Sequence, residues 1–180
     1  MKVLLHACCA PCAAQIIKEL QKMGHEICVY FYNPNIFPKE EYDLRFNELK
    51  RYTEDLQIPL IEGRYDHKDW LEKVKGLENE PEGGRRCYQC FLHNLGEVAQ
   101  KAYEEGFKAL ATTLTISPHK PVEMINSIGQ KSADFYGLKF IDQVWRKNNG
   151  YKNSCDLSRK YNFHRQNYCG CEFSIKDKNQ

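Results

Sequence analysis

The sequence has little that could hold the chain in a membrane or send it across one. Its 180 residues contain no apolar run that approaches the length of a membrane-spanning helix, which is roughly 20 residues. The apolar run near the N-terminus, residues 3–5, is too short for a signal peptide. We therefore expect a cytoplasmic protein that makes no contact with a membrane.

The sequence also lacks the glycine-rich loops with which many enzymes bind nucleotides. No G-x-G-x-x-G follows a predicted strand, the Walker A pattern is absent, and nothing resembles a Ser-His-Asp triad. Internal repeats and low-complexity tracts are missing as well. With 42% hydrophobic and 28% charged residues, the composition is that of a globular protein. The length suits one α/β domain with a small appendage.

Cysteine, in contrast, is abundant for a chain of this size. The nine cysteines are odd in number and tightly grouped, whereas the disulfide framework of a secreted domain would space them more evenly. In a reducing compartment such groups indicate metal ligands or redox-active thiols. Cys28 is predicted to be a buried strand residue, and Cys155 is assigned no role. The three groups are Cys8-Cys9-x-x-Cys12, Cys87-x-x-Cys90 and Cys169-x-Cys171.

The first group lies where an apolar run gives way to a helical pattern that begins near Pro11. This order predicts a strand, a tight turn and a helix. The first amides of a helix leave their N–H groups free and carry a partial positive charge. Thiolates or an anionic metal cluster would be stabilised at this position.

The rest of the chain alternates between strand and helix patterns. The periodicity predicts strands at residues 1–7, 25–32, 59–62, 107–116 and 139–144, and helices at 11–23, 39–57, 67–75, 90–105, 121–135 and 154–166. A polar loop over residues 78–86 would deliver the chain to Cys87.

The alternation predicts an α/β fold with a parallel sheet of about five strands and helices on both faces. In such folds the ligand site lies beyond the C-terminal ends of the strands. We expect residues 1–145 to form this domain and to carry the metal site. Residues 146–180 would form a helical or irregular extension that carries the last cysteine pair and packs on the same domain.

Two of the cysteine groups supply four thiols that suit a [4Fe–4S] cluster or a structural zinc ion: Cys8, Cys9, Cys87 and Cys90. The adjacent pair is awkward for one tetrahedral ion, but a cluster accommodates it because each thiolate binds a different iron. Cys12 could replace Cys8, since Cys9-x-x-Cys12 has the conventional spacing. Arg85 and Arg86 are expected to offset the negative charge of the cluster.

The last group, Cys169-Gly170-Cys171, is predicted to be a redox-active pair. In an extended strand the two Cα atoms would lie near or beyond the roughly 4.4–6.8 Å that a disulfide permits. The backbone must therefore bend, and Gly170 allows the bend at little steric cost. A strained disulfide is readily reduced. The alternatives are two further metal ligands or unremarkable thiols.

Basic residues gather in the last part of a chain whose net charge is only +2. Residues 143–171 set Asp156 alone against Arg146, Lys147, Lys152, Arg159, Lys160 and Arg165. The same segment contains the aromatic residues Tyr151, Tyr161, Phe163 and Tyr168. Basic groups interleaved with aromatics suit a nucleic-acid backbone and unstacked bases. An ordinary solvated surface with packing aromatics is the alternative.

Four motifs occur in an order that resembles the cobalamin-independent epoxyqueuosine reductase family. They are H-x-C-C-x-P-C at residues 6–12, R-R-C-Y-x-C at 85–90, L-x-I-S-P-H-K at 114–120 and C-G-C at 169–171. The resemblance spans essentially the whole chain. It implies a Rossmann-like fold related to the nucleotide-α-hydrolase-type tRNA-modifying proteins.

The resemblance also implies a reaction, in which the epoxide of epoxyqueuosine at the wobble position of tRNA is deoxygenated to queuosine. This last step of queuosine synthesis consumes two electrons and two protons and releases water. Carried over by motif, the residues Cys8, Cys9, Cys87 and Cys90 would ligate a [4Fe–4S] cluster. Cys169 and Cys171 would form a redox-active disulfide. A second, mononuclear iron near Cys12 with a carboxylate is a further option, and the electron donor is not identified.

Three other functions compete with this interpretation. An ATP-using, cluster-dependent tRNA thiolase would need a loop such as S-G-G-x-D-S after the first strand, where this chain has Ala7–Cys12 without glycine or serine. A zinc-stabilised RNA-binding module would be colourless, whereas an iron–sulfur protein absorbs visible light. A thiol–disulfide oxidoreductase would act on protein dithiols without tRNA.

Overall fold

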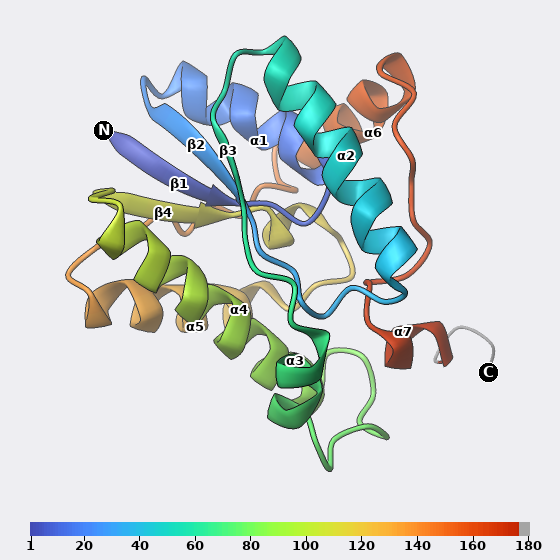
Figure 1. The fold of residues 1–180 in the computed structure, drawn as a ribbon. Coiled ribbons are helices and arrows are strands. Elements are labelled where there is room, and N and C mark those ends of the chain that lie inside the picture. The colour runs from blue at the N-terminus through green and yellow to red at the C-terminus, as the bar shows by residue number, and fades with distance from the viewer. Residues whose placement is uncertain (177–180) are drawn as a thin grey trace.

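The computed structural model describes residues 1–176 and contains one five-stranded parallel sheet (Figure 1). The strand order is β3-β2-β1-β4-β5. The strands are β1 (Lys2–His6), β2 (Glu26–Phe31), β3 (Leu60–Glu62), β4 (Ala109–Thr112) and β5 (Lys139–Phe140). The helices are α1 (Ala10–Lys22), α2 (Lys39–Asp55), α3 (His67–Lys73), α4 (Arg85–Glu104), α5 (Val122–Phe135), α6 (Gly150–Lys160) and α7 (Glu172–Lys176), with a 3-10 turn η1 (Leu114–Ile116).

The central strand β1 is buried on both faces, because helices cover both sides of the sheet (Figure 1). Val3 and Leu5 pack in one apolar cluster with residues of α1, α2 and α6. Leu4 points to the other face and packs with residues of α4 and α5. Successive side chains of a strand alternate between faces, so a continuous apolar run is what a doubly covered parallel strand requires. The predicted fold class is confirmed.

The strand order reverses at β1, which pairs with β2 on one side and with β4 on the other. A crevice opens at such a switch point beyond the C-terminal ends of the two strands. Cys8 follows β1 and Thr113 follows β4. The backbone N–H of Cys8 donates a hydrogen bond to Thr113 Oγ1 at 3.3 Å, so the two strand ends meet there.

Helix α4 begins at Arg85, five residues before the predicted start at Cys90. Gly84 is its N-cap residue, and Gly83 has a φ of +86°. The guanidinium of Arg86 donates to the carbonyl oxygens of Glu78 and Glu80, which folds the preceding loop back on the first turn. Cys87 therefore lies in the first turn of α4; the predicted loop ends at Gly84 instead of Arg86, and the predicted helix start at Cys90 is wrong.

The predicted strand over residues 107–116 is also wrong in its second half, where β4 ends at Thr112 and η1 follows. The β-branched run suggested a strand, but its hydroxyl groups bond nearby backbone. Thr112 Oγ1 accepts from the N–H of Leu114 at 3.3 Å, and Thr115 Oγ1 donates to the carbonyl of Gln143 at 2.7 Å. Such bonds compete with the ladder of a sheet.

The C-terminal segment packs against the sheet domain through α6. Helix α6 covers residues 150–160 rather than the predicted 154–166, because Asn149 and Asn162 have positive φ values before and after it. Ser154 Oγ donates to the carbonyl of Pro11 at 2.6 Å, and Leu157 lies in the same apolar cluster as β1. The chain then runs along α2 to α7, a short helix that the sequence did not predict (Figure 1). Within residues 1–176, no helix combines the length and apolar character needed to cross a bilayer.

Candidate metal and thiol site

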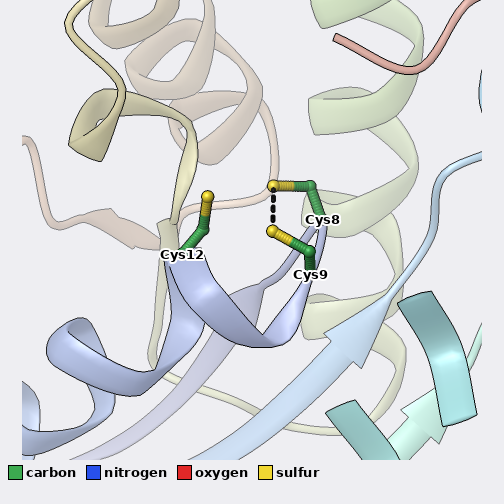
Figure 2. Close-up of side chains that lie close together, drawn as sticks. All are labelled: Cys8, Cys9 and Cys12. Atoms are coloured by element: carbon green, nitrogen blue, oxygen red, sulfur yellow. Dashed lines mark hydrogen bonds between the residues drawn. The ribbon is translucent and has the colours of Figure 1, made fainter. Parts of the chain in front are cut away.

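Three thiols lie together at the turn between β1 and α1 (Figure 2). Cys9 is the N-cap residue of α1 with extended backbone, and Pro11 occupies the first turn, where its missing N–H costs nothing. The sulfur atoms of Cys8, Cys9 and Cys12 all lie within 4.8 Å of one another. Cys8 Sγ and Cys9 Sγ are 3.7 Å apart. This arrangement offers three soft ligands to one metal centre.

Hydrogen-bond donors surround these thiols. Thr113 Oγ1 donates to Cys8 Sγ at 3.6 Å, and Gln166 Nε2 donates to Cys9 Sγ at 3.3 Å. The first turn of α1 contains no acidic residue, so the positive end of the helix dipole faces the sulfurs without a competing anion. Hydrogen bonds from Cys12 and Cys9 hold the pKa of Cys8 well below its usual range. The pKa of Cys9 is raised to about 12 and that of Cys12 is also raised. The free site therefore stabilises one negative charge, on Cys8, and a metal would displace the protons of the other two thiols.

Cys87 and Cys90 lie on the first two turns of α4, outside the group of three. Both are buried, with 7% and 8% of their surface exposed. Cys87 Sγ accepts from the N–H of Gly83 at 3.2 Å, and Asn94 Nδ2 lies 4.0 Å from Cys90 Sγ. Burial raises the pKa of both thiols. Neutral buried thiols of this kind become ligands when a metal displaces their protons.

One cavity of about 450 Å³ connects the thiols of the two halves of the chain. Its lining includes Cys8 and Cys12 from the N-terminal turn, Cys90 from α4 and Cys169 from the C-terminal segment. The wall also contains apolar side chains such as Ile36 and Phe91, and polar and basic ones such as Asn33, Lys120, Arg165 and Gln166. The cavity lies where the sequence predicted a site, beyond the ends of β1 and β4.

The predicted redox pair lies in the segment between α6 and α7, and both cysteines are free thiols. Gly170 has a φ of +140°, a conformation that residues with a side chain rarely adopt. Cys169 is partly exposed to the cavity, whereas Cys171 is 6% exposed and packs in an apolar cluster with Trp70 and Phe173. The two thiols therefore have different surroundings.

Two largely buried cations contact this segment, and neither was predicted from the sequence. The side chain of Lys120 is 9% exposed, and its Nζ lies 2.6 Å from Cys169 Sγ. Arg45 is 1% exposed and donates to the carbonyl oxygen of Cys169 at 3.1 Å. Lys120 is the last residue of the L-x-I-S-P-H-K motif, so the motif could have pointed to it as a site residue. Arg45 has the helical spacing of the apolar residues of α2, so it lies on the same face of the helix, and its burial could have been expected from that spacing.

The expected role of Arg85 is wrong. Its side chain is 78% exposed and pairs with Glu80 instead of facing the thiols. The ring of His6 lies near the same strand ends and bonds Thr112 Oγ1 and the carbonyl of Tyr32 at 3.0 and 3.1 Å. Burial lowers the pKa of His6. A neutral, fully bonded imidazole between two strands is a structural group.

The chain matches the sequence model of the family described as epoxyqueuosine reductase QueH over residues 3–177. Among curated relatives, the QueH protein of Acinetobacter baylyi is 42% identical over 99% of this chain and 83% of its own length. The QueH protein of Haemophilus influenzae is 38% identical over 99% of this chain and 74% of its own length. The QueH protein of Thermotoga maritima is 34% identical over 99% of this chain and 92% of its own length.

A solved structure has a similar fold at low sequence identity. It is the U34-tRNA thiolase NcsA from Methanococcus maripaludis with its [4Fe-4S] cluster, which aligns with a TM-score of 0.58 and 13% identity. The alignment covers 99% of this chain and 63% of the thiolase chain. At this identity the likeness concerns the fold alone. The matches to the reductases cover the chain equally well but at 34–42% identity, so they show the family. The chain belongs to the epoxyqueuosine reductase QueH family.

Proposed function

We propose that this protein reduces the epoxide of epoxyqueuosine in tRNA to the cyclopentene of queuosine. The observation that carries the proposal is the match to the QueH family over residues 3–177. The reaction removes one oxygen atom from the substrate as water and consumes two electrons and two protons. A cavity that brings thiols of both halves of the chain together supports a redox reaction at this position.

The substrate is the modified nucleotide of a tRNA anticodon, which enters this cavity. Its volume of about 450 Å³ falls in the range of roughly 300–1,000 Å³ that is usual for small-molecule sites. Tyr151 lines the cavity and is 39% exposed, so its ring can stack on a base at the entrance. Arg165 lines the same cavity and can bind phosphate.

The donor set of the site fits a [4Fe–4S] cluster. Every candidate ligand is a thiol, and four thiolates are what such a cluster requires. We assign the ligands to Cys8, Cys9, Cys87 and Cys90. Cys12 lies within 4.8 Å of two of them, so it is an alternative ligand or, with a carboxylate, the holder of a second iron. When bound, the cluster supplies single-electron transfer and Lewis acidity.

Cys169 and Cys171 act as the two-electron store beside that site. Their two thiols give up two electrons and two protons as a disulfide forms, and these balance the loss of one oxygen as water. An external electron donor then reduces the disulfide again. The left-handed Gly170 between them gives the backbone a bend that an ordinary residue would resist. The cavity position of Cys169 puts one thiol of the pair next to the substrate space.

The test is anaerobic reconstitution with iron and sulfide, followed by incubation with epoxyqueuosine-containing tRNA and a reductant. We expect a coloured protein and nucleosides in which epoxyqueuosine has lost the mass of one oxygen. A colourless, zinc-containing protein without turnover would support the RNA-binding module instead. Reduction of protein disulfides without any effect on tRNA would support a thiol–disulfide oxidoreductase.

A further inference from the structure

We propose that Lys120 is a positioning residue of the redox pair, whose ammonium group stabilises negative charge on the sulfur of Cys169 and makes it the reactive thiol. This inference rests on the proposed redox role of the pair. The Nζ of Lys120 lies 2.6 Å from Cys169 Sγ. A cation beside a cysteine favours its thiolate, which is the nucleophilic form.

Burial of the lysine strengthens this contact. The side chain of Lys120 is 9% exposed, so little water competes for its ammonium group. Glu82 Oε1 lies 3.4 Å from the same nitrogen and offers a second, weaker partner. Burial alone would lower the pKa of Lys120, but the charge and hydrogen bond of Cys169 outweigh it and raise this pKa above its ordinary value. With the Cys169 thiolate beside it, the lysine therefore stays charged.

The loop that carries Lys120 is held in place from a different element. The Nη1 of Arg146 donates to the carbonyl oxygens of Ser117, Pro118 and Lys120 at 3.1, 3.3 and 3.2 Å. Three bonds from one guanidinium fix the backbone of a short segment that follows η1. The ammonium group consequently reaches Cys169 from a prepared position, as electrostatic preorganisation requires.

The surroundings of Cys171 differ: hydrogen bonds from Ser174 and the charge of Arg86 favour its thiolate, but burial outweighs them. It is 6% exposed and packs with Cys90 and Phe173 in an apolar cluster. Burial raises the pKa of Cys171. The titratable and charged groups around Cys169 lie on α4, on the loop before it, on the η1–α5 loop, on α2 and on its own segment. They are Cys87, Cys90, Glu82 (through Lys120), Lys120, Arg45 and Cys171. The Nζ of Lys120 contacts the Cys169 sulfur directly.

The test is the alkylation rate of individual cysteines in the reduced, cluster-loaded protein without tRNA. Iodoacetamide is the probe, and fragment mass spectrometry separates modification at Cys169 from that at Cys171. At pH 7 we expect the rate at Cys169 to fall at least about tenfold in Lys120→Met, because the thiolate loses its neighbouring cation. Raising the pH to about 10, where a thiol ionises without help, should largely remove this deficit.

Conservative and distant substitutions separate electrostatics from packing. Lys120→Arg keeps the charge and should restore most of the rate at Cys169. Lys152→Met removes an exposed lysine of α6 and should leave the rate unchanged. Cys155 serves as the reference thiol in every sample.

An unchanged rate at Cys169 in Lys120→Met would overturn the proposal, and so would an equal loss in Lys120→Met and Lys120→Arg. If Lys120→Met does not fold, the alkylation rate at Cys169 is compared between Lys120→Arg and the wild type over a range of pH. Because Lys120→Arg keeps the cation, the proposal predicts the same dependence of this rate on pH in both proteins. The proposed function is tested separately. Failure of the wild type to convert epoxyqueuosine in tRNA would refute that function without touching the alkylation result.

Discussion

The thiols at the N-terminal turn and the thiols near the C-terminus are held in different ways. Cys8, Cys9 and Cys12 come from five consecutive residues between a buried strand and a helix, and their neighbours Ala7 and Ala10 are fully buried. Local chain geometry alone brings these sulfurs within 4.8 Å of one another. Metal ligands benefit from such rigid supports, because coordination tolerates little displacement.

Cys169 and Cys171 lie instead in a segment that long-range contacts hold against the domain. The N–H of Phe37 donates to the carbonyl of Gly170 at 2.8 Å, and Tyr168 Oη donates to the carbonyl of Phe37 at 2.7 Å. Arg45 adds a bond to the carbonyl of Cys169. The proposed alternation between dithiol and disulfide would require a change of local geometry, and a docked segment can make that change without disturbing the sheet.

The largest expected effect concerns the rigid group. Cys9→Ser removes one proposed ligand, and we expect bound iron after anaerobic reconstitution to fall at least about tenfold. Loss of a residue that only hydrogen-bonds to a ligand already costs roughly 10–100-fold in metal affinity. Cys155→Ser is the matched control, because Cys155 lies on α6 beside Arg165 Nη2 at 3.4 Å. Iron content should be measured by colorimetric assay. Equal iron in Cys9→Ser and the control would contradict the ligand assignment.

The next effect separates the two groups. Cys169→Ser or Cys171→Ser should leave the iron content intact and abolish turnover on tRNA, because the remaining thiol cannot form the disulfide. Iron assay and nucleoside analysis on the same sample give both readouts. Sustained turnover in either variant would refute the dithiol role, and loss of iron would assign these residues to the metal instead.

A smaller effect is expected when the bend between the two cysteines is disturbed. A Cβ at position 170 would lie 3.1 Å from Ile36 Cγ1, and the new residue would have to adopt a φ of +140°. Left-handed backbone costs a residue with a side chain roughly 1–2 kcal/mol, so we expect Gly170→Ala to lower turnover about tenfold and to speed proteolysis of this segment. Gly106→Ala also has a positive φ of +72°, but it has open space around it. This control should lose a little thermal stability and keep its turnover.

The smallest effect is expected at the edge of the docked segment. Tyr168→Phe removes the hydrogen bond to the carbonyl of Phe37 and keeps the ring that lies 5.4 Å from the Arg45 guanidinium. A net hydrogen bond contributes about 0.5–1.5 kcal/mol, and this one is exposed. We expect about a two- to threefold loss of turnover with unchanged iron content. A loss as large as that of Gly170→Ala would show that the hydroxyl has a further role.

The same comparison explains what the sequence could predict. The alternation of apolar strands and amphipathic helices predicts the fold, and Cys8, Cys9 and Cys12 are close because they are neighbours along the chain. The contacts of Cys169 come from residues 49 and 124 positions away, Lys120 and Arg45, and no local pattern contains them. The errors at β4 and at the start of α4 have a similar cause, since polar side chains bonded the backbone there.

The central claim is that thiols from both halves of the chain hold one iron–sulfur cluster beside the redox pair. The most direct test is the iron and sulfide content of the Cys87→Ser, Cys90→Ser double variant after anaerobic reconstitution, with circular dichroism to show that it is folded. The account predicts that the wild type binds four iron and four sulfide per chain and that the folded double variant binds neither in that ratio. A folded double variant with the full wild-type content would contradict the account.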